Sequence, residues 1–428
     1  MAMHYRRIAE YLRSAFAGRG LPEIARLTPR SEPARPRVPR GTSFTEEAIT
    51  QRWALPGLPA SAREVLADRR TLDERHAYAR AIENFIGTVK VPVGLAGPLR
   101  VNGAHAQGDY YVPLATTEAA LVSSYSRGAQ LITDAGGCAS VVLSEGVTRA
   151  PGFVFDTLGE AALFVAWTSG EFGTLKAVAS QTTQHGELVD MQFAVEGNHV
   201  HIQLEFTTGD AAGQNMVTIA ADAICQHLAA RSPVRPKHWF IEANMSGDKK
   251  ATTLSFTTVR GKKVSSEVLV PGALLEKYLH TNARVMADYA RMSMLGGVMS
   301  GSIGVHGHYA NGLAALFIAC GQDAACVAEA AVGITRLEPR DDGALYVAVT
   351  LPSLIVGTVG GGTRLPSQQA CLDILGLAGA GQARAFAEVV AGVALAGELS
   401  IIGALAAGHF TRAHQQLARG VRTLPPPA

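Results

Sequence analysis

The order of apolar patterns in the middle of this sequence constrains its fold more than any other feature. Strand and helix patterns follow one another at 152–155 (strand), 158–169 (helix), 188–195 and 199–206 (strands), 215–230 (helix) and 239–243 (strand). The order β-α-β-β-α-β is that of the split-βαβ, or ferredoxin-like, module. The sequence therefore predicts an α+β protein that contains such a module.

The segments on both sides of this module differ from it in composition. They are richer in glycine and alanine, and they contain long helix patterns at 274–294 and 382–407. A chain of 428 residues that is 47% hydrophobic can bury more than one core. We therefore expect a large helix-rich domain, formed by residues 55–150 and 244–428, with a small domain, residues 151–243, inserted into it.

Residues 1–54 form an arginine- and proline-rich start of the chain. The ordinary interpretation is a short amphipathic helix near 4–17 followed by a linker. Glutamates in this segment argue against a transit peptide, and no apolar core of the length that a secretory signal needs is present. We expect a cytoplasmic protein.

Charge and cysteine content exclude several classes of protein. A net charge of +2 without a basic stripe argues against nucleic-acid binding. The five cysteines lie in apolar or small-residue surroundings without metal-ligand spacing, which predicts buried thiols in a reducing compartment, with no disulfide and no metal. The run 389–408 is apolar enough for a membrane span, but Glu398 in its middle and its many small residues favour a helix in a soluble core, so we expect no membrane partner.

Asp248, Lys249 and Lys250 stand side by side after a turn pattern, Met245-Ser246-Gly247, at the exit of the small module. Lysine pairs are ordinarily solvated surface residues. Two ammonium groups and a carboxylate at a glycine turn nevertheless form a compact charged group.

Two glycine clusters are candidates for ligand contact. "GDAAGQNM", residues 209–216, lies between a strand and a helix, where free N–H groups favour an anion; an ordinary strand-to-helix turn is the alternative. "GTVGGGT", residues 357–363, is costly to order, which indicates either a ligand close to the backbone or tight helix packing.

Two acids and a histidine also stand out. Thr116 or Thr117 is predicted to cap a helix with Glu118 in its first turn. Asp323 lies within an apolar run, so we expect it to be buried and either paired with a cation or neutral. Such an acid belongs either to a functional site or to the core, where its polar atoms are hydrogen-bonded. His414, near the end of the chain, is by itself most simply a surface residue.

Seven motifs occur in a fixed order: "ENFIGTVKVPVGLAGPL" (83–99), "ATTEAALV" (115–122), "GDAAGQNM" (209–216), "GDKK" (247–250), "IACGQDAA" (318–325), "GTVGGGT" (357–363) and "GELSIIGALAAGH" (397–409). Together they closely resemble the 3-hydroxy-3-methylglutaryl-coenzyme A (HMG-CoA) reductase family, in the arrangement of the soluble catalytic domain of class I enzymes. The resemblance extends from about residue 55 to residue 416.

The resemblance implies an oxidoreductase of isoprenoid biosynthesis, soluble and bacterial. In this family the small domain carries NADPH or NADH and the large domain binds the acyl-CoA. Two hydride transfers reduce the thioester to mevalonate, through a thiohemiacetal and an aldehyde, and release coenzyme A. The family also implies a homodimer or higher homo-oligomer, with "ENFIGTVKVPVG" at the subunit interface and the active site assembled across it.

The matching positions imply individual roles. Lys249 would stabilise the negative charge that builds on the carbonyl oxygen. Glu118 matches the family's acid, Asp323 couples it to Lys249, and His414 matches the proton donor to the coenzyme A thiolate. The substrate contacts would be Arg149, Asn244, Asp248, Lys250 and Asn311. The cofactor contacts would be Asp210, Gly213, Gln214, Asn215, Gly360, Gly361, Gly362 and Thr363.

Three positions depart from the family pattern. Glu242 stands where animal and plant enzymes have a serine that contacts the substrate carboxylate, and an extra acid there is unfavourable unless it points away. Met292, with Arg291 beside it, stands where the family has a lysine. Residues 180–188 lack the arginine that meets the cofactor's 2′-phosphate, so we expect only a moderate preference for NADPH.

Other functions remain open at this point. The same site could oxidise mevalonate with NAD or reduce a different acyl-CoA. A coenzyme A acyltransferase would use Cys320 or Cys326 as nucleophile and His414 as base. A non-catalytic binding protein is disfavoured, because Glu118, Lys249, Asp323 and His414 are all present.

Overall fold

The structure, a computed structural model, describes residues 5–16 and 33–408. The chain divides into two compact units, Met1–Val89 and Lys90–Ala428. In the first unit a small core of Phe44, Ile49, Trp53 and Phe85 holds three short helices together. The described helices of this unit are α1 (Tyr5–Phe16), α3 (Glu46–Trp53), α4 (Ala60–Leu66), α5 (Arg69–Asp73) and the 3₁₀ helix η2 (Arg75–Tyr78).

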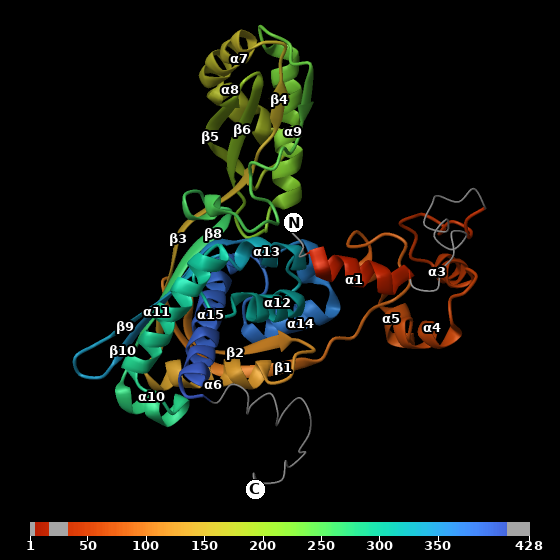
Figure 1. The fold of residues 1–428 in the computed structure, drawn as a ribbon. Helices are drawn as coiled ribbons and strands as arrows, with labels where there is room; N and C mark the ends of the chain where they lie inside the picture. Colours follow the sequence, from red (N-terminus) through yellow and green to blue (C-terminus); the bar gives the residue numbers. More distant parts are fainter. Residues whose placement is uncertain (1–4, 17–32, 409–428) are drawn as a thin grey trace. The chain divides into compact units, whose positions relative to one another are not determined.

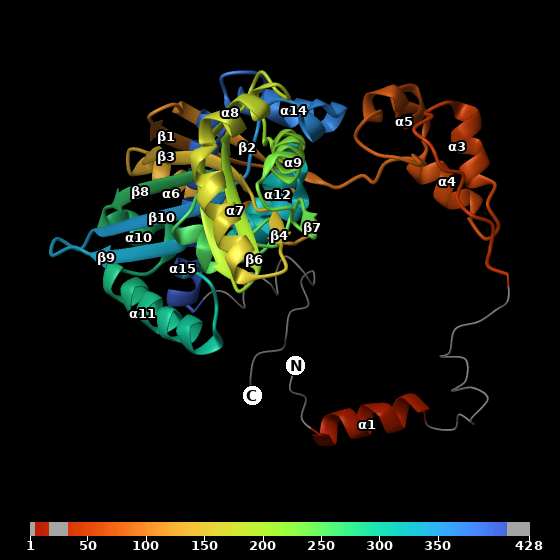
Figure 2. The same cartoon turned by 90° about the horizontal axis from the view of Figure 1, so that it is seen from above.

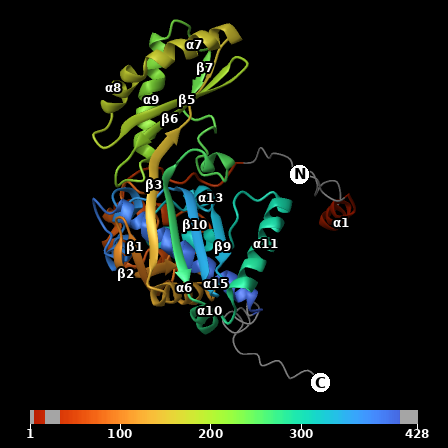
Figure 3. The ribbon, with the colours of Figure 1, turned by 90° about the vertical axis from the view of Figure 1, so that its left-hand side faces the viewer.

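The second unit is built on a ten-stranded sheet, in which β7, β4, β6, β3, β8, β10 and β9 follow one another. Strand β3 joins its two halves, because its first part pairs with β1 and β8 whereas Val147–Arg149 pair with β6. Figure 3 shows β3 passing from the lower part of this unit into the module above, and Figure 2 shows β8, β10 and β9 side by side. The strands of the lower part are β1 (Val93–Gly103), β2 (Gln107–Ala115), β3 (Cys138–Arg149), β8 (Gly261–Val270), β9 (Ile334–Pro339) and β10 (Leu345–Leu354).

Helix α15 (Ala383–Ala406) is the centre of the lower part (Figure 1). It contacts strands β3, β8 and β10 and several helices, and its apolar side chains belong to the main core. It is long and apolar enough to cross a membrane, but 83% of its apolar window is buried inside the protein, as in the core helix of a soluble protein. The surrounding helices are α6 (Leu121–Asp134), α10 (Gly272–Leu279), α11 (Ala283–Ser300), α12 (Tyr309–Ala319), α13 (Val327–Ala330) and α14 (Pro366–Leu375).

The upper module has the predicted order of elements. Its four strands form the antiparallel order β7-β4-β6-β5, with a core of its own that includes Phe153, Phe164 and Leu204. This arrangement confirms the predicted α+β class with a ferredoxin-like module. The elements are β4 (Gly152–Val154), α7 (Leu158–Gly170), α8 (Phe172–Ser180), β5 (Glu187–Glu196), β6 (His199–Thr207), α9 (Gln214–Arg231) and β7 (His238–Phe240).

Three local predictions were incomplete or wrong. Helix α8 was not predicted. Its N-cap residue, Glu171, makes no side-chain capping bond, so the sequence carries no capping signal at the start of this helix. The predicted helix 274–294 is two helices, since His280 has a left-handed φ of 55° and Asn282 caps α11. Thr116 does not cap a helix that holds Glu118: α6 begins at Leu121, after Ala120 in a left-handed conformation (φ 70°), so Glu118 lies in the preceding turn.

Candidate active site

Lys249 and Asp323 form an ion pair between two loops. The Lys249 Nζ lies 2.8 Å from the Asp323 Oδ2, and the two side chains are 40% and 41% exposed. The hydrogen bond with Asp323 raises the pKa of Lys249 above its usual value. The predicted pairing of Asp323 with a cation is confirmed, but its predicted burial is wrong. A half-exposed ammonium held by a carboxylate can meet a polar ligand from solvent.

The backbone sets the direction of Lys249. Lys250 N donates to Gly247 O (3.1 Å), which closes a turn over 247–250 directly after the predicted one, and Gly247 and Lys249 both have left-handed φ angles, 74° and 55°. A non-glycine residue in this conformation is uncommon and concentrates at functional sites. The Lys250 ammonium donates to Asp248 O (2.9 Å) from an exposed position.

Arg149 and Asp248 lie in a buried charge network behind this turn. The Arg149 Nη1 donates to Asp248 Oδ2 (3.0 Å), and Arg260 donates to the other oxygen of Asp248 and to Glu329. Burial by itself would raise the pKa of Asp248, but Arg260 and Arg149 hold it below its usual value. Asp248 is therefore an ionised carboxylate that fixes two guanidinium groups.

The two predicted glycine clusters pack against each other. Thr358 N donates to Asp210 O (2.9 Å), and a Cβ on Gly357 would lie 2.5 Å from Ala212 N. The carboxylate of Asp210 accepts bonds from Gly381 N (2.7 Å) and Ala383 N (3.2 Å) at the start of α15. Asp210 thus joins the module to the lower part of the unit.

The remaining predicted cofactor residues surround these loops. Gly213, with φ 76°, precedes the first turn of α9, where Gln214 and Asn215 stand. The side chain of Gln214 donates to Cys326 Sγ (2.8 Å). In the second cluster Gly360 and Gly361 have positive φ, and a Cβ added to either of them would meet nothing within 4 Å, so a ligand can approach their backbone.

The same glycine cluster reaches the Asp323 loop. A Cβ on Gly321 would lie 2.3 Å from Gly362 O, so the two backbones touch, and Thr363 beside them is buried. The structure thereby brings Lys249, Asp323 and both glycine clusters into one contiguous region.

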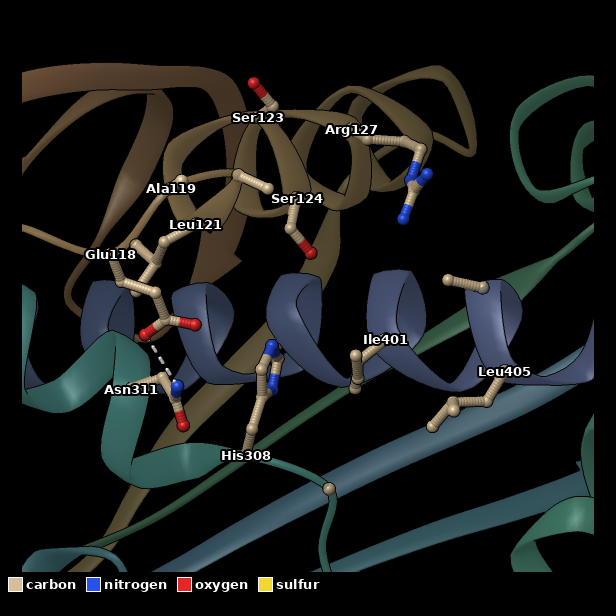
Figure 4. A pocket seen from close by; sticks show the side chains of 13 residues that line it. Glu118, Ala119, Leu121, Ser123, Ser124, Arg127, His308, Asn311, Ile401 and Leu405 are labelled. Atoms are coloured by element: carbon tan, nitrogen blue, oxygen red, sulfur yellow. Dashed lines mark hydrogen bonds between the residues drawn. The ribbon is translucent and has the colours of Figure 1, made fainter. Parts of the chain in front are cut away.

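Glu118 lies in a different setting, on one wall of a cavity of about 420 Å³ (Figure 4). Its Oε2 accepts a bond from Asn311 Nδ2 (2.8 Å), so these two predicted site residues are brought together. Ser124, Arg127 and His308 also line the cavity. A carboxyl group at a cavity with polar partners can bind a ligand or transfer a proton.

His308 is held at this cavity by the buried Glu398 of α15. The Glu398 carboxylate accepts bonds from Gly307 N (2.7 Å), His308 N (2.8 Å) and Thr335 Oγ1 (2.8 Å), and its Oε1 lies 3.6 Å from His308 Nδ1. Burial by itself would raise the pKa of Glu398, but His308 and the two backbone donors hold it below its usual value. Glu398 therefore fixes the loop between α11 and α12 that positions His308.

Replacing Glu398 with glutamine should destabilise the protein by roughly 2–4 kcal/mol at pH 7, because three donors lose a charged acceptor that is itself fully buried. The pKa of Glu398 is lower in the folded chain than in the unfolded chain. Its contribution to the free energy of unfolding is therefore fully present when the pH is above the unfolded-state pKa, and it is lost as the pH falls through the folded-state pKa. Urea unfolding should show a difference between wild type and variant that shrinks in acid. The exposed Glu276→Gln is the control, with a change within about 0.5 kcal/mol; an equally stable Glu398→Gln protein would contradict this role.

Some predicted residues stay apart and others were missed. Among the described residues, no hydrogen bond or ion pair connects the Glu118–Asn311 pair with the Lys249–Asp323 pair within one chain. His414 lies outside the described residues. Arg260 and His308 were not predicted; a histidine beside Asn311 in "HGHYAN" was the available signal for the second.

The cysteine-nucleophile alternative finds no support in the structure. Cys320 and Cys326 are fully buried, and burial raises the pKa of both thiols far above the usual value. A buried thiol with a raised pKa is a poor nucleophile. All five cysteines are free and buried.

A comparison with models of protein families shows to which family this chain belongs. The model, described as hydroxymethylglutaryl-coenzyme A reductase, matches residues 49–419. The chain belongs to the hydroxymethylglutaryl-coenzyme A reductase family. This confirms the resemblance drawn from the seven motifs.

Relatives named 3-hydroxy-3-methylglutaryl-coenzyme A reductase match over most of the chain. The Aeropyrum pernix protein is 43% identical over 381 residues, which is 88% of this chain and 90% of the relative. The Haloferax volcanii protein is 44% identical over 349 residues, 80% of this chain and 86% of the relative.

A solved structure of the class II reductase from Streptococcus pneumoniae, bound to NADPH, has a TM-score of 0.63 with 19% identity. The aligned region covers 81% of this chain and 95% of the Streptococcus pneumoniae chain. At 19% identity this similarity is evidence for the fold alone. The class I arrangement of the present reductase stays a prediction.

Proposed function

We propose that this chain reduces HMG-CoA to mevalonate and free coenzyme A with two equivalents of NADPH or NADH. The observation that carries the proposal is the Lys249–Asp323 ion pair beside the two glycine clusters, in a member of the reductase family. Each hydride addition to the acyl carbon builds negative charge on its oxygen. A preorganised ammonium stabilises that charge more than it stabilises the ground state.

Three side chains complete the proposed chemistry. Glu118, at the cavity and hydrogen-bonded to Asn311, supplies the proton to the oxygen. Asp323 positions Lys249 and keeps it protonated. His414 supplies the proton that lets coenzyme A leave as a thiol, a role that rests on the sequence match alone.

The turn that holds Lys249 and the cavity that holds Glu118 would bind the substrate. Arg149, Asp248 and Lys250 would meet the polar methylglutaryl end, and Asn244 and Asn311 would add hydrogen bonds. The acyl-CoA is accordingly proposed to bind to the large domain, residues 55–150 and 244–428, with the cofactor on the small domain, residues 151–243.

The residues of the two glycine clusters fit a nicotinamide dinucleotide. The first turn of α9, an 18-residue helix after Gly213, offers N–H groups to a pyrophosphate. Gly360 and Gly361 have open space where a side chain would stand, and Asn215 and Thr363 add polar groups. The bound cofactor would supply the hydrides. The described residues hold no cluster of three or more His, Cys, Asp or Glu suited to a metal.

We further propose a homodimer or higher oligomer in which neighbouring subunits complete each site. Met292, Leu295 and Met299 lie along one side of α11 at 75%, 65% and 85% exposure, and Val93 and Leu95 of β1 are exposed as well. A row of exposed apolar side chains along one side of a helix is typical of a protein–protein interface. The separation of the Glu118 and Lys249 pairs within one chain agrees with a site shared between subunits. The free, buried thiols agree with a cytoplasmic location.

The absorbance of the reduced nicotinamide tests the function. With HMG-CoA present, we expect oxidation of both NADPH and NADH, with a moderately higher kcat/KM for NADPH, as in the family. A higher kcat/KM for NADH would contradict the cofactor preference. No oxidation of either nicotinamide in the presence of HMG-CoA would contradict the function itself.

A further inference from the structure

The guanidinium of Arg149, at the end of β3, is already occupied by two carboxylates. Its Nη1 donates to Asp248 Oδ2 (3.0 Å) and to Glu242 Oε2 (3.3 Å), and its side chain is only 7% exposed. Its Nη2 donates to the backbone carbonyl of Gln214 (3.4 Å). Both N–H groups of Nη1 are therefore taken by carboxylates as long as Glu242 stays in place.

Glu242 is held firmly in this position. Besides Arg149, its carboxylate accepts bonds from Asn244 N (2.8 Å), Ser246 Oγ (3.0 Å) and Ala150 N (3.4 Å). These contacts fold residues 242–246 back toward β3. Glu242 thus points toward Arg149, so the acid that departs from the family's serine faces the site instead of pointing away from it.

Glu242 belongs to a network that already contains more carboxylates than guanidinium groups. The buried guanidinium groups of Arg149 and Arg260 face three acids, Glu242, Asp248 and Glu329. A carboxylate that arrives at Arg149 adds a further negative charge to this network, and closely placed like charges oppose binding. The guanidinium is not saturated, however, because the buried Nε of Arg149 has no hydrogen-bond partner in the described part of the chain.

We propose that Glu242 is a specificity-determining residue that occupies Arg149 in place of the substrate's terminal carboxylate and must be displaced when that carboxylate binds. The inference rests on the proposed function, because it assumes that Arg149 receives the terminal carboxylate of HMG-CoA. The vacated Nη1–H then binds the incoming carboxylate. Displacement costs binding energy only for a charged acyl end, so Glu242 weakens the selection of HMG-CoA over neutral acyl groups.

The test is the steady-state kinetics of Glu242→Gln, which keeps the shape of the side chain and removes its charge. We expect the KM for HMG-CoA to fall about tenfold, with kcat within about twofold of wild type. The second substrate is an HMG-CoA analogue whose terminal carboxylate is a primary amide, and its KM should not change. Glu196→Gln, an exposed position at the end of β5, is the matched control and should leave both values unchanged.

A KM for HMG-CoA that is unchanged or higher in Glu242→Gln would overturn the inference, as would an equal fall for the amide. Glu242→Ser is the second variant, and failure of both variants to fold would show that Glu242 is structural. A wild-type protein that does not reduce HMG-CoA would overturn the proposed function itself, whereas wild-type turnover without the KM effect overturns the role of Glu242 alone.

Discussion

Replacing Lys249 with alanine should lower kcat for HMG-CoA by roughly 10²–10³, the usual effect of removing one preorganised donor to an oxyanion. The 2.8 Å contact with Asp323 and the left-handed backbone fix the ammonium before substrate arrives, so its loss affects the transition state more than binding. Alanine also carries a Cβ, so the strain at this backbone position changes little. Initial rates of NADPH oxidation at saturating substrate measure the effect.

The control for this variant is Lys277→Ala. Lys277 is 60% exposed on α10 and pairs with Asp134, far in sequence from the turn. We expect its kcat to stay within about twofold of wild type, because an exposed ion pair contributes little. A folded Lys249→Ala protein with near-normal kcat would remove Lys249 from the mechanism.

Replacing Glu118 with glutamine should lower kcat by roughly 10²–10⁴ while the KM for HMG-CoA changes little. Glutamine can still accept the bond from Asn311 Nδ2, so the wall of the cavity is kept, but it has no proton to give at neutral pH. Rates measured over a range of HMG-CoA concentrations separate the two parameters. Proportional losses of affinity and turnover would instead indicate a structural role for Glu118.

The same variant also tests whether subunits share the site. If Glu118 of one subunit acts with Lys249 of its neighbour, a dimer of one Glu118→Gln and one Lys249→Ala chain has one intact site. Random exchange of subunits in a mixture should then restore about a quarter of wild-type activity, by the symmetry of a dimer. Activity that never rises above that of the separate variants, after exchange is verified, would place both residues in one subunit.

The fold of the module was predictable because its signals are local. Alternation over 188–195 and 199–206 and the apolar helix near 215–230 agree with β5, β6 and α9. The break at His280 was not predictable from periodicity, since the apolar pattern continues across it while Asn282 starts a new helix. The left-handed conformation of Ala120, directly before α6, was not predictable either, because glycine is the residue that usually indicates this conformation in a sequence.

The site was predictable to the extent that motifs carried it. The Asp-Lys-Lys turn and the "GQDAA" motif predicted Lys249 and Asp323, but only the fold places them 2.8 Å apart. The direction of Glu242 could not be read from the sequence, because it depends on backbone donors at Ala150 and Asn244. Glu398 was visible as an acid in an apolar run, but its contact with the His308 loop depends on packing of distant segments.

The stoichiometry of the complete reaction tests the central claim most directly. Wild-type protein, a limiting amount of HMG-CoA and excess NADPH are incubated to completion, and oxidised nicotinamide, free thiol and mevalonate are measured in the same sample. Reduction of a thioester to an alcohol requires two hydrides, so we expect two NADPH oxidised for each thiol released and each mevalonate formed. Release of thiol without oxidation of nicotinamide would show hydrolysis or acyl transfer and would contradict the account.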